Sequence, residues 1–289
     1  MRWFSRRRGG APQSDVKSAP PAAPARESAL PRSGEPLPEA LQRLAHDDAI
    51  PDELIEWFEA ELALEAAAAG GGVPPALDLR ELRVRVDGMP DWWAAGGNIL
   101  LAAPDAAPVV PEISLIPQHP TNCITILGDG ARVRQLVFMG DRGMIVVGRT
   151  VNFWGISLAA IGSATIMIGE NSSATFDGSL DARNGGSIYV GADGMWGAGI
   201  RIITDDMHAI RDRSTGERLN MRGGRITIEP HVWLAEQVRI MGQCRIGEGS
   251  VVGMGSLVTG RDLPGHSVCV GRPAKPVRDN ICWSRDDAS

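Results

Sequence analysis

Hydrophobic residues between positions 226 and 258 recur with a period of six. The main series is Ile228, Leu234, Ile240, Ile246, Val252 and Val258. A second series, two residues earlier, is Ile226, Val232, Val238, Cys244, Ser250 and Ser256. This period suits neither an α-helix nor one flat strand, but it is typical of short parallel strands coiled around a shared core. Because strand side chains alternate, both series point inward, and the branched main series is predicted to fill the axis. Six consecutive repeats argue against a β-sandwich with accidental spacing.

The same pattern extends toward the N-terminus. Its first clear pair is Ile124 and Ile126, so the coil is predicted to begin near Cys123. The sets that follow are Ile145, Val147, Phe153 and Ala159, then Ile166, Ile168, Ala174 and Leu180, then Ile188, Val190, Trp196, Ile200 and Ile202. Three hexads make one three-sided turn, which predicts an all-β solenoid, a parallel β-helix of about six turns. We expect this domain to span residues 123–263, followed by a C-terminal extension over 264–289.

One long segment interrupts the repeat. Residues 203–225 are strongly charged and contain a single histidine, His208, with Asp205, Asp206 and Asp212 close by in sequence. A loop of this length that leaves a regular solenoid is usually functional.

The N-terminal part of the chain has a different character. Residues 1–34 are rich in Pro, Ala, Ser and Arg, which predicts a disordered tail. Trp3 and Phe4 lie among arginines, but two aromatics anchor weakly, so membrane contact by this tail is the less favoured interpretation. Residues 35–72 have helical periodicity, with Pro38 and Pro51 opening two helices. This helical hairpin is expected to cover the open end of the coil or a neighbouring subunit.

Residues 73–122 are rich in proline and are interpreted as an irregular linker region. The segment contains a candidate strand at Leu82–Val86 and the pair Trp92-Trp93, whose indoles are expected in the core.

Composition narrows the functional class. The net charge of −6 argues against nucleic acid as a partner. Four scattered cysteines, with no CxxC pair and no histidine at metal spacing, predict reduced thiols, no metal site and a cytoplasmic protein. The chain has no run of about 18 apolar residues that would predict a membrane span, and its start lacks the apolar segment of a secretory signal.

Three stretches carry a family resemblance: DDMHAIRD, ITIEPHVWLAEQVRIMGQCRIGEGSVVGMGSLV and GRPAK. Together they resemble the hexapeptide-repeat acyltransferases, which include galactoside, maltose and xenobiotic O-acetyltransferases and acetyltransferases of polysaccharide biosynthesis. The resemblance covers roughly residues 123–285 and is strongest over 200–285. It implies a left-handed β-helix with an extruded loop, a homotrimer, and acetyl-coenzyme A as acyl donor.

The resemblance also implies residue roles. His208 matches the histidine that deprotonates the acceptor in a cleft between subunits, a role that suits neutral imidazole near pH 7. Asp206 or Asp212 would hold its tautomer, and the sequence does not choose between them. His231 is interpreted as structural. The residues that match the coenzyme A cradle are Trp233, Gly253, Gly255, Ser256, Thr259, Arg261, Arg272, Pro273 and Lys275. The chain departs from the family pattern at Ala235, Glu236 and the inserted Gly260.

These observations predict an enzyme that moves an acetyl or other short acyl group from acyl-coenzyme A to a hydroxyl of a sugar or glycan precursor. Two alternatives stay open. One is a trimeric β-helix that has lost catalysis and serves as a scaffold or binding module. The other is an N-acyltransferase acting on an amino sugar.

Overall fold

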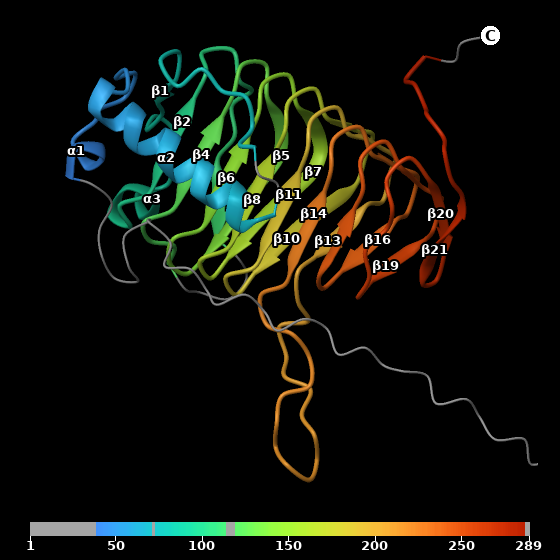
Figure 1. Cartoon of the computed structure of the whole chain (residues 1–289). Helices are drawn as coiled ribbons and strands as arrows, with labels where there is room; N and C mark the ends of the chain where they lie inside the picture. The colour runs from blue at the N-terminus through green and yellow to red at the C-terminus, as the bar shows by residue number, and fades with distance from the viewer. Residues whose placement is uncertain (1–38, 71–72, 114–118, 287–289) are drawn as a thin grey trace, which may run out of the picture.

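The computed structural model describes residues 39–70, 73–113 and 119–286. The predicted tail over 1–34 lies outside these residues, and so does its proposed membrane contact. In the described part the chain winds into a three-sided β-solenoid of about seven turns, one more than the repeat predicted (Figure 1). The solenoid is left-handed, as the family resemblance implied.

The first face of the solenoid is an eight-stranded sheet in the order β1-β2-β4-β6-β8-β11-β14-β17. Its strands are β1 (Arg83–Val84), β2 (Ile99–Ala102), β4 (Ile124–Leu127), β6 (Met144–Val147), β8 (Thr165–Ile168), β11 (Ser187–Val190), β14 (Arg225–Ile228) and β17 (Cys244–Ile246). Every pair in it is parallel except β1 with β2. Parallel neighbours result from a coil that returns to the same face once per turn.

The other two faces form one thirteen-stranded sheet, because β7 (Asn152–Ile161) bends around the corner between them and pairs with both β9 and β10. The second face contains β9 (Ser173–Ala174), β12 (Met195–Trp196), β15 (Trp233–Leu234), β18 (Val251–Val252), β20 (Val268–Gly271) and β21 (Ala274–Arg278). The third contains β3 (Pro111–Ile113), β5 (Arg132–Met139), β10 (Gly178–Arg183), β13 (Arg201–Ile203), β16 (Arg239–Met241) and β19 (Leu257–Thr259).

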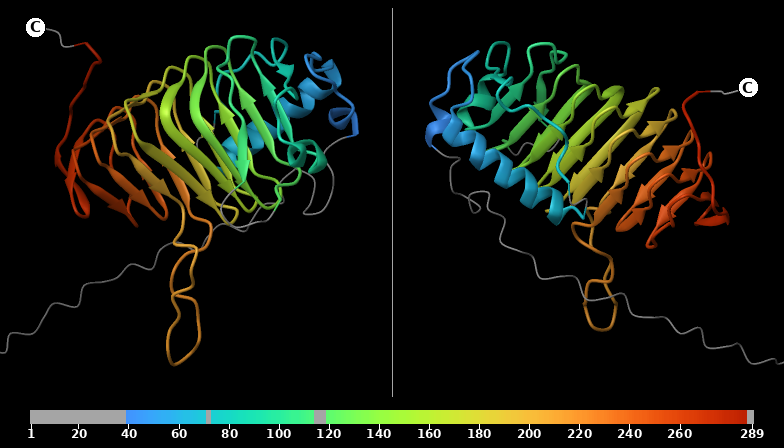
Figure 2. Two further views of the ribbon diagram at one scale, coloured as in Figure 1. Left: turned by 180° about the vertical axis from the view of Figure 1, so that it is seen from behind. Right: turned by 45° about the horizontal axis from the view of Figure 1, so that its top comes forward.

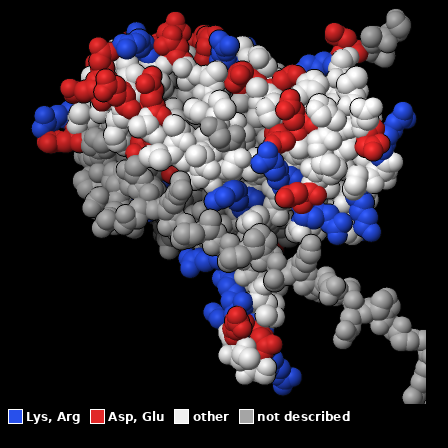
Figure 3. All heavy atoms as spheres, viewed as in Figure 1, with Lys and Arg blue, Asp and Glu red and all other residues white. Residues whose placement is uncertain are grey.

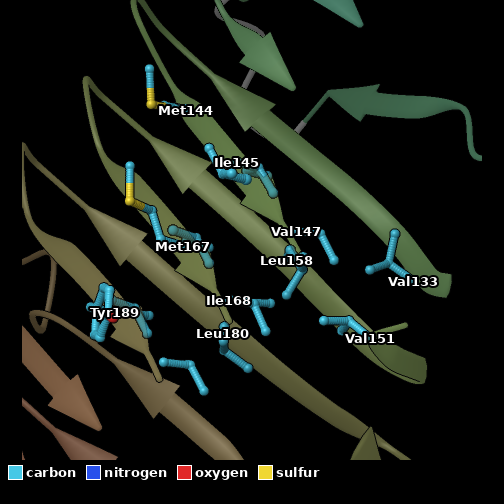
Figure 4. Packing of buried hydrophobic residues seen from close by; sticks show 14 of the residues in the cluster. Val133, Met144, Ile145, Val147, Val151, Leu158, Met167, Ile168, Leu180 and Tyr189 are labelled. Atoms are coloured by element: carbon cyan, nitrogen blue, oxygen red, sulfur yellow. The ribbon is translucent and has the colours of Figure 1, made fainter. Parts of the chain in front are cut away.

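The side chains that point into the coil confirm the prediction made from the six-residue repeat. Strand register stacks Ile145, Ile166, Ile188 and Ile226 above one another, and all four side chains are fully buried. Figure 4 shows part of this core, where Ile145 lies with Val147, Leu158, Ile168 and Leu180.

The first predicted pair is out of register by one residue. In β4, Thr125 pairs with Ile145 and Leu127 with Val147, so Thr125 and Leu127 face the axis. Ile124 and Ile126 face outward instead, yet both are fully buried. The strand is covered on both sides, and aliphatic residues are favoured on both of its faces.

The outer cover of the first face is the helix α2 (Asp52–Ala68), which crosses its strands (Figures 1 and 2). Three sheet hydroxyls secure this segment. Thr165 Oγ1 donates to Glu65 Oε2 at 2.7 Å, Thr227 Oγ1 to Ala69 O at 2.8 Å, and Tyr189 Oη to Val73 O at 2.8 Å. The long helix therefore covers a side of the coil and not its end, whereas residues 47–49 of the helical region pair with β1 at the N-terminal edge of this face. The expected first helix is short, α1 (Glu39–Gln42).

Residues 73–122 contribute more than a linker. The segment holds β1, the helix α3 (Asp91–Ala95), β2 and β3, and β2 pairs in parallel with β4. The coil therefore starts one turn earlier than residue 123. Trp93 is buried, and its ring lies 5.4 Å from that of Phe138, so this indole belongs to the core as predicted.

Candidate functional site

The long loop predicted around His208 leaves the coil between β13 and β14 and projects away from it (Figure 1). Its two arms are held to each other by backbone hydrogen bonds from Leu219 N to Ile210 O at 2.7 Å and from Asp212 N to Glu217 O at 2.8 Å. The loop is therefore a hairpin with internal order.

Asp205 anchors the base of this hairpin. Its side chain is buried and accepts hydrogen bonds from Asn184 Nδ2 at 2.8 Å, Gly223 N at 2.9 Å and Met207 N at 2.7 Å. Burial raises the pKa of Asp205, but these hydrogen bonds outweigh it, and the net pKa is lowered. The ionised carboxylate thus connects both ends of the loop to the preceding coil. Sequence reasoning noted Asp205 and gave it no role.

His208 is exposed on the first arm of the loop. Its backbone is fixed: His208 N donates to Asp206 O at 2.8 Å, and Asn220 Nδ2 donates to His208 O at 2.7 Å. The same Asn220 amide donates to Asp206 Oδ2 at 3.1 Å. Within the described residues no hydrogen bond reaches the imidazole, so the ring is available to a ligand or a second chain.

Neither aspartate proposed to orient His208 contacts its ring in the described part of the chain. The Asp212 carboxylate instead accepts from Ser214 N at 2.8 Å, Ser214 Oγ at 2.6 Å and Thr215 N at 2.8 Å. The hydrogen bonds from Ser214 and Thr215 lower the pKa of Asp212 to about 2. Asp212 thus caps the turn at the loop tip, while Asp206 is held by Asn220.

The residues expected to cradle coenzyme A gather at the C-terminal coils and the β20–β21 hairpin. Trp233 stands on the outer side of β15, 36% exposed, in register between Met195 and Val251. Gly253 lies on the corner after β18, where a Cβ would approach Val270 Cγ1 to 2.6 Å. The glycine therefore allows the hairpin to close against the corner.

Arg272 ties the same hairpin to the corner. Its Nε donates to Gly255 O at 2.6 Å, and Gly255 itself has a φ of +66°, which favours glycine. Ser256 is buried, and its Oγ accepts from Gly271 N at 3.1 Å, so the structure places it inside the coil rather than on a ligand-facing surface. The remaining candidates, Thr259, Arg261, Pro273 and Lys275, are exposed near this hairpin.

The departures from the family pattern lie at the same end. Glu236 is exposed on the corner before β16, and its carbonyl accepts from Gly255 N at 2.8 Å. Gly260 follows β19 with a φ of +61°, a conformation that favours glycine, and no atom lies within 4 Å of a Cβ built on it. In Figure 3 acidic side chains gather over the N-terminal end, whereas basic side chains lie along the loop and near its base.

A cluster that sequence reasoning missed joins the chain end to the coil. His231 Nδ1 lies 2.6 Å from Asp193 Oδ2, and its Nε2 lies 3.0 Å from Trp283 O. The rings of His231 and Trp283 stack with centroids 4.0 Å apart. His231 is therefore structural, as predicted, but its main partner comes from the polar C-terminal extension. The isolated tryptophan in that extension was the available signal.

Several curated relatives share sequence with this chain, among them the following three. A putative acetyltransferase of Schizosaccharomyces pombe is 34% identical over 91 residues, which are 32% of this chain and 42% of the relative. A putative acetyltransferase of Staphylococcus aureus is 46% identical over 57 residues, 20% and 28% of the two chains. A galactoside O-acetyltransferase of Lactococcus lactis is 37% identical over 92 residues, 32% and 42% of the two chains. The chain thus spans less than half the length of these relatives. No family model matches it.

The fold has a solved counterpart in the polySia-specific acetyltransferase NeuO. The TM-score is 0.60 at 24% identity, and the match covers 67% of this chain and 81% of that one. Repeat sequence and fold agree: the chain is a hexapeptide-repeat left-handed β-helix that resembles the acetyltransferases built on this architecture.

Proposed function

We propose that the protein is an acyltransferase that moves an acetyl group from acetyl-coenzyme A to a hydroxyl of a sugar or glycan precursor. The observation that carries the proposal is an exposed, backbone-fixed His208 on a hairpin extruded from a β-helix similar to that of acetyltransferases. The galactoside O-acetyltransferase among the relatives supports a sugar acceptor.

His208 is the proposed general base. Its neutral imidazole accepts the acceptor's hydroxyl proton while the acceptor oxygen attacks the thioester carbonyl. A carbon–oxygen bond forms, the carbon–sulfur bond breaks, and the proton passes from the imidazole to the departing thiolate. Asn220 keeps His208 in place by holding its carbonyl, which makes Asn220 a positioning residue.

The site is proposed to be shared between copies in a homotrimer. The loop projects away from its own coil and exposes Ile210, Leu219 and Met221, with 57%, 63% and 45% of their surface accessible. Apolar side chains on a projecting hairpin suit burial against a second chain. In that arrangement His208 of one copy faces the C-terminal coils of another, at the corner after β18 that contains Gly253 and Gly255.

The residues at that corner suit coenzyme A. The exposed Trp233 indole offers an apolar surface to the pantetheine chain, and the glycine corner allows close approach of a ligand. Arg261, Arg272 and Lys275 offer cations to its phosphates. Bound acetyl-coenzyme A would supply the activated acyl thioester. Glu236 carries the same negative charge as the phosphates, and this repulsion is expected to weaken the cofactor's affinity.

The test measures free-thiol release from acetyl-coenzyme A over a panel of sugars and amino sugars. For His208→Ala we expect kcat to fall at least about 100-fold while calorimetry gives an unchanged Kd for coenzyme A. His119→Ala, which removes an exposed histidine far from the loop in sequence, is the matched control and should keep full activity. On sizing, both variants should elute with wild-type protein.

Each alternative has its own outcome. Wild-type protein that releases no thiol and binds no coenzyme A would replace the enzyme proposal with a scaffold. Turnover confined to amino sugars would identify an N-acyltransferase. Unchanged kcat in His208→Ala would remove this residue from the base role.

A further inference from the structure

The last described residues run back along the coil as a strap, here defined as 280–286. Ile281 N donates to His266 O at 2.9 Å. Trp283 then reaches His231, two coils earlier, and Arg285 reaches the two coils before that. A chain end is usually poorly ordered unless specific contacts hold it, and here such contacts extend over several coils.

Arg285 fixes the far end of the strap. Its Nε donates to Asp193 Oδ1 at 2.8 Å and its Nη1 to Ser173 Oγ at 2.8 Å. Its Nη2 donates to Asn171 O and to Gly194 O, each at 3.0 Å. The guanidinium thus binds two neighbouring coil corners at once, one at residues 171–173 and one at 193–194. This needs the planar, forked group that distinguishes arginine from lysine.

Trp283 is fixed next to it by a reciprocal pair. Trp283 Nε1 donates to His231 O at 3.0 Å, and His231 Nε2 faces Trp283 O at 3.0 Å. Asp193 contacts both Arg285 and the other imidazole nitrogen. Contacts therefore fix the position of Trp283 in three ways: through its backbone carbonyl, through stacking of its ring on His231, and through its indole Nε1.

The fixed indole lies beside Trp233. Their ring centroids are 6.0 Å apart at an angle of 51°, within the range of attractive aromatic pairs. Along the second face, the in-register neighbours of Trp233 are Met195 and Val251. Trp233 nevertheless keeps 36% of its surface exposed, so a ligand can still contact it.

We propose that the strap is the outer wall of the cofactor site. Trp283, held by His231, Asp193 and Arg285, positions the Trp233 indole against the pantetheine chain of the acyl donor. The inference rests on the proposed coenzyme A-dependent function, and it assigns the C-terminal extension a role in donor affinity and none in the chemical step.

The test compares Trp283→Ala and Arg285→Ala with wild type. We expect the KM for acetyl-coenzyme A, and the calorimetric Kd of coenzyme A, to rise about three- to tenfold while kcat stays within about twofold. Trp283→Phe keeps an aromatic ring and Arg285→Lys keeps a cation, so each should recover part of the affinity. Arg132→Ala, an exposed arginine of β5, is the matched control and should change nothing.

The outcomes separate the two proposals. Unchanged coenzyme A affinity in both alanine variants, or a fall in kcat at constant KM, would overturn the strap as a wall of the site while leaving the enzyme in place. Wild-type protein without coenzyme A binding would overturn the proposed function and this inference with it. Thermal unfolding of each variant shows whether it is folded, and Arg285→Lys provides the comparison if Arg285→Ala is not.

Discussion

The buried carboxyl of Glu61 in helix α2 is expected to make the stability of the fold depend on pH. Its side chain is 2% exposed, and Oε2 is buried without a hydrogen-bond partner in the described residues. Burial raises the pKa of Glu61 from 4.5 to about 7, and the negative charge of Glu65 adds to the shift. The folded protein therefore holds a proton at this site under conditions in which the unfolded chain has released it.

The sign of the effect on stability follows. Below pH 4.5 both states are protonated at this site. As pH rises from there to about 7, the folded state binds more protons than the unfolded state, so the free energy of unfolding decreases and then levels off. The shift from 4.5 to about 7 corresponds to a loss of about 3 kcal/mol, at about 1.4 kcal/mol per pKa unit.

Glu61→Gln removes this titration while keeping nearly the same shape. We expect urea unfolding, followed by circular dichroism between pH 5 and 8, to show a steeper decline for wild type than for the variant. The variant should therefore be the more stable protein at pH 8, whereas the difference should be small at pH 5. Glu59→Gln changes an exposed glutamate of the same helix and should follow wild type throughout. Parallel pH profiles for wild type and Glu61→Gln would refute the reasoning.

Two further predictions concern the loop and the thiols. Asp205→Ala removes the acceptor of three hydrogen bonds at the loop base. Limited trypsin digestion should cleave between Arg211 and Arg222 faster than in wild type, and equal cleavage rates would show that other contacts hold the loop. Burial raises the pKa of Cys123 and of Cys244 to about 12, and it raises that of Cys269. A chromogenic disulfide reagent should therefore titrate one thiol rapidly in native protein, the exposed Cys282, and all four in denaturant; a second fast thiol would contradict the burial.

The hexad pattern predicted the register of β6 and β8 correctly, although both strands are buried on both faces. An inward position on a narrow axis accepts a branched aliphatic side chain, so residues such as Ile228 and Ile246 indicate their orientation. In β4 an inward position holds Thr125 while Ile124 and Ile126 lie on the covered outer face, so the aliphatic pattern there indicates the wrong register. The position of α2 on the first face could not be predicted from the sequence, because the apolar side of an amphipathic helix does not indicate which apolar surface it packs against.

The candidate site was predicted unevenly for a related reason. Ser256 belongs to an inward hexad position, which already argued against a ligand-facing role, and the structure buries it. Asp212 was chosen for its closeness to His208 in sequence. Its carboxylate instead accepts hydrogen bonds from the backbone N–H groups two and three residues later, and these contacts form only in the turn at the loop tip.

Helix α2 and the strap cover part of the solenoid surface and so limit where a partner chain can bind. Helix α2 buries the first face, and the strap crosses the corner between the first and second faces. Among the strands of the first face that the structure describes, none carries a large apolar side chain counted as exposed. Trp154, Phe176 and Met254, each at least 60% exposed, lie on or next to the corner between the second and third faces, and Met241 lies on the third. Because apolar surface of this extent favours burial, the partner chains of the proposed homotrimer are expected on that side.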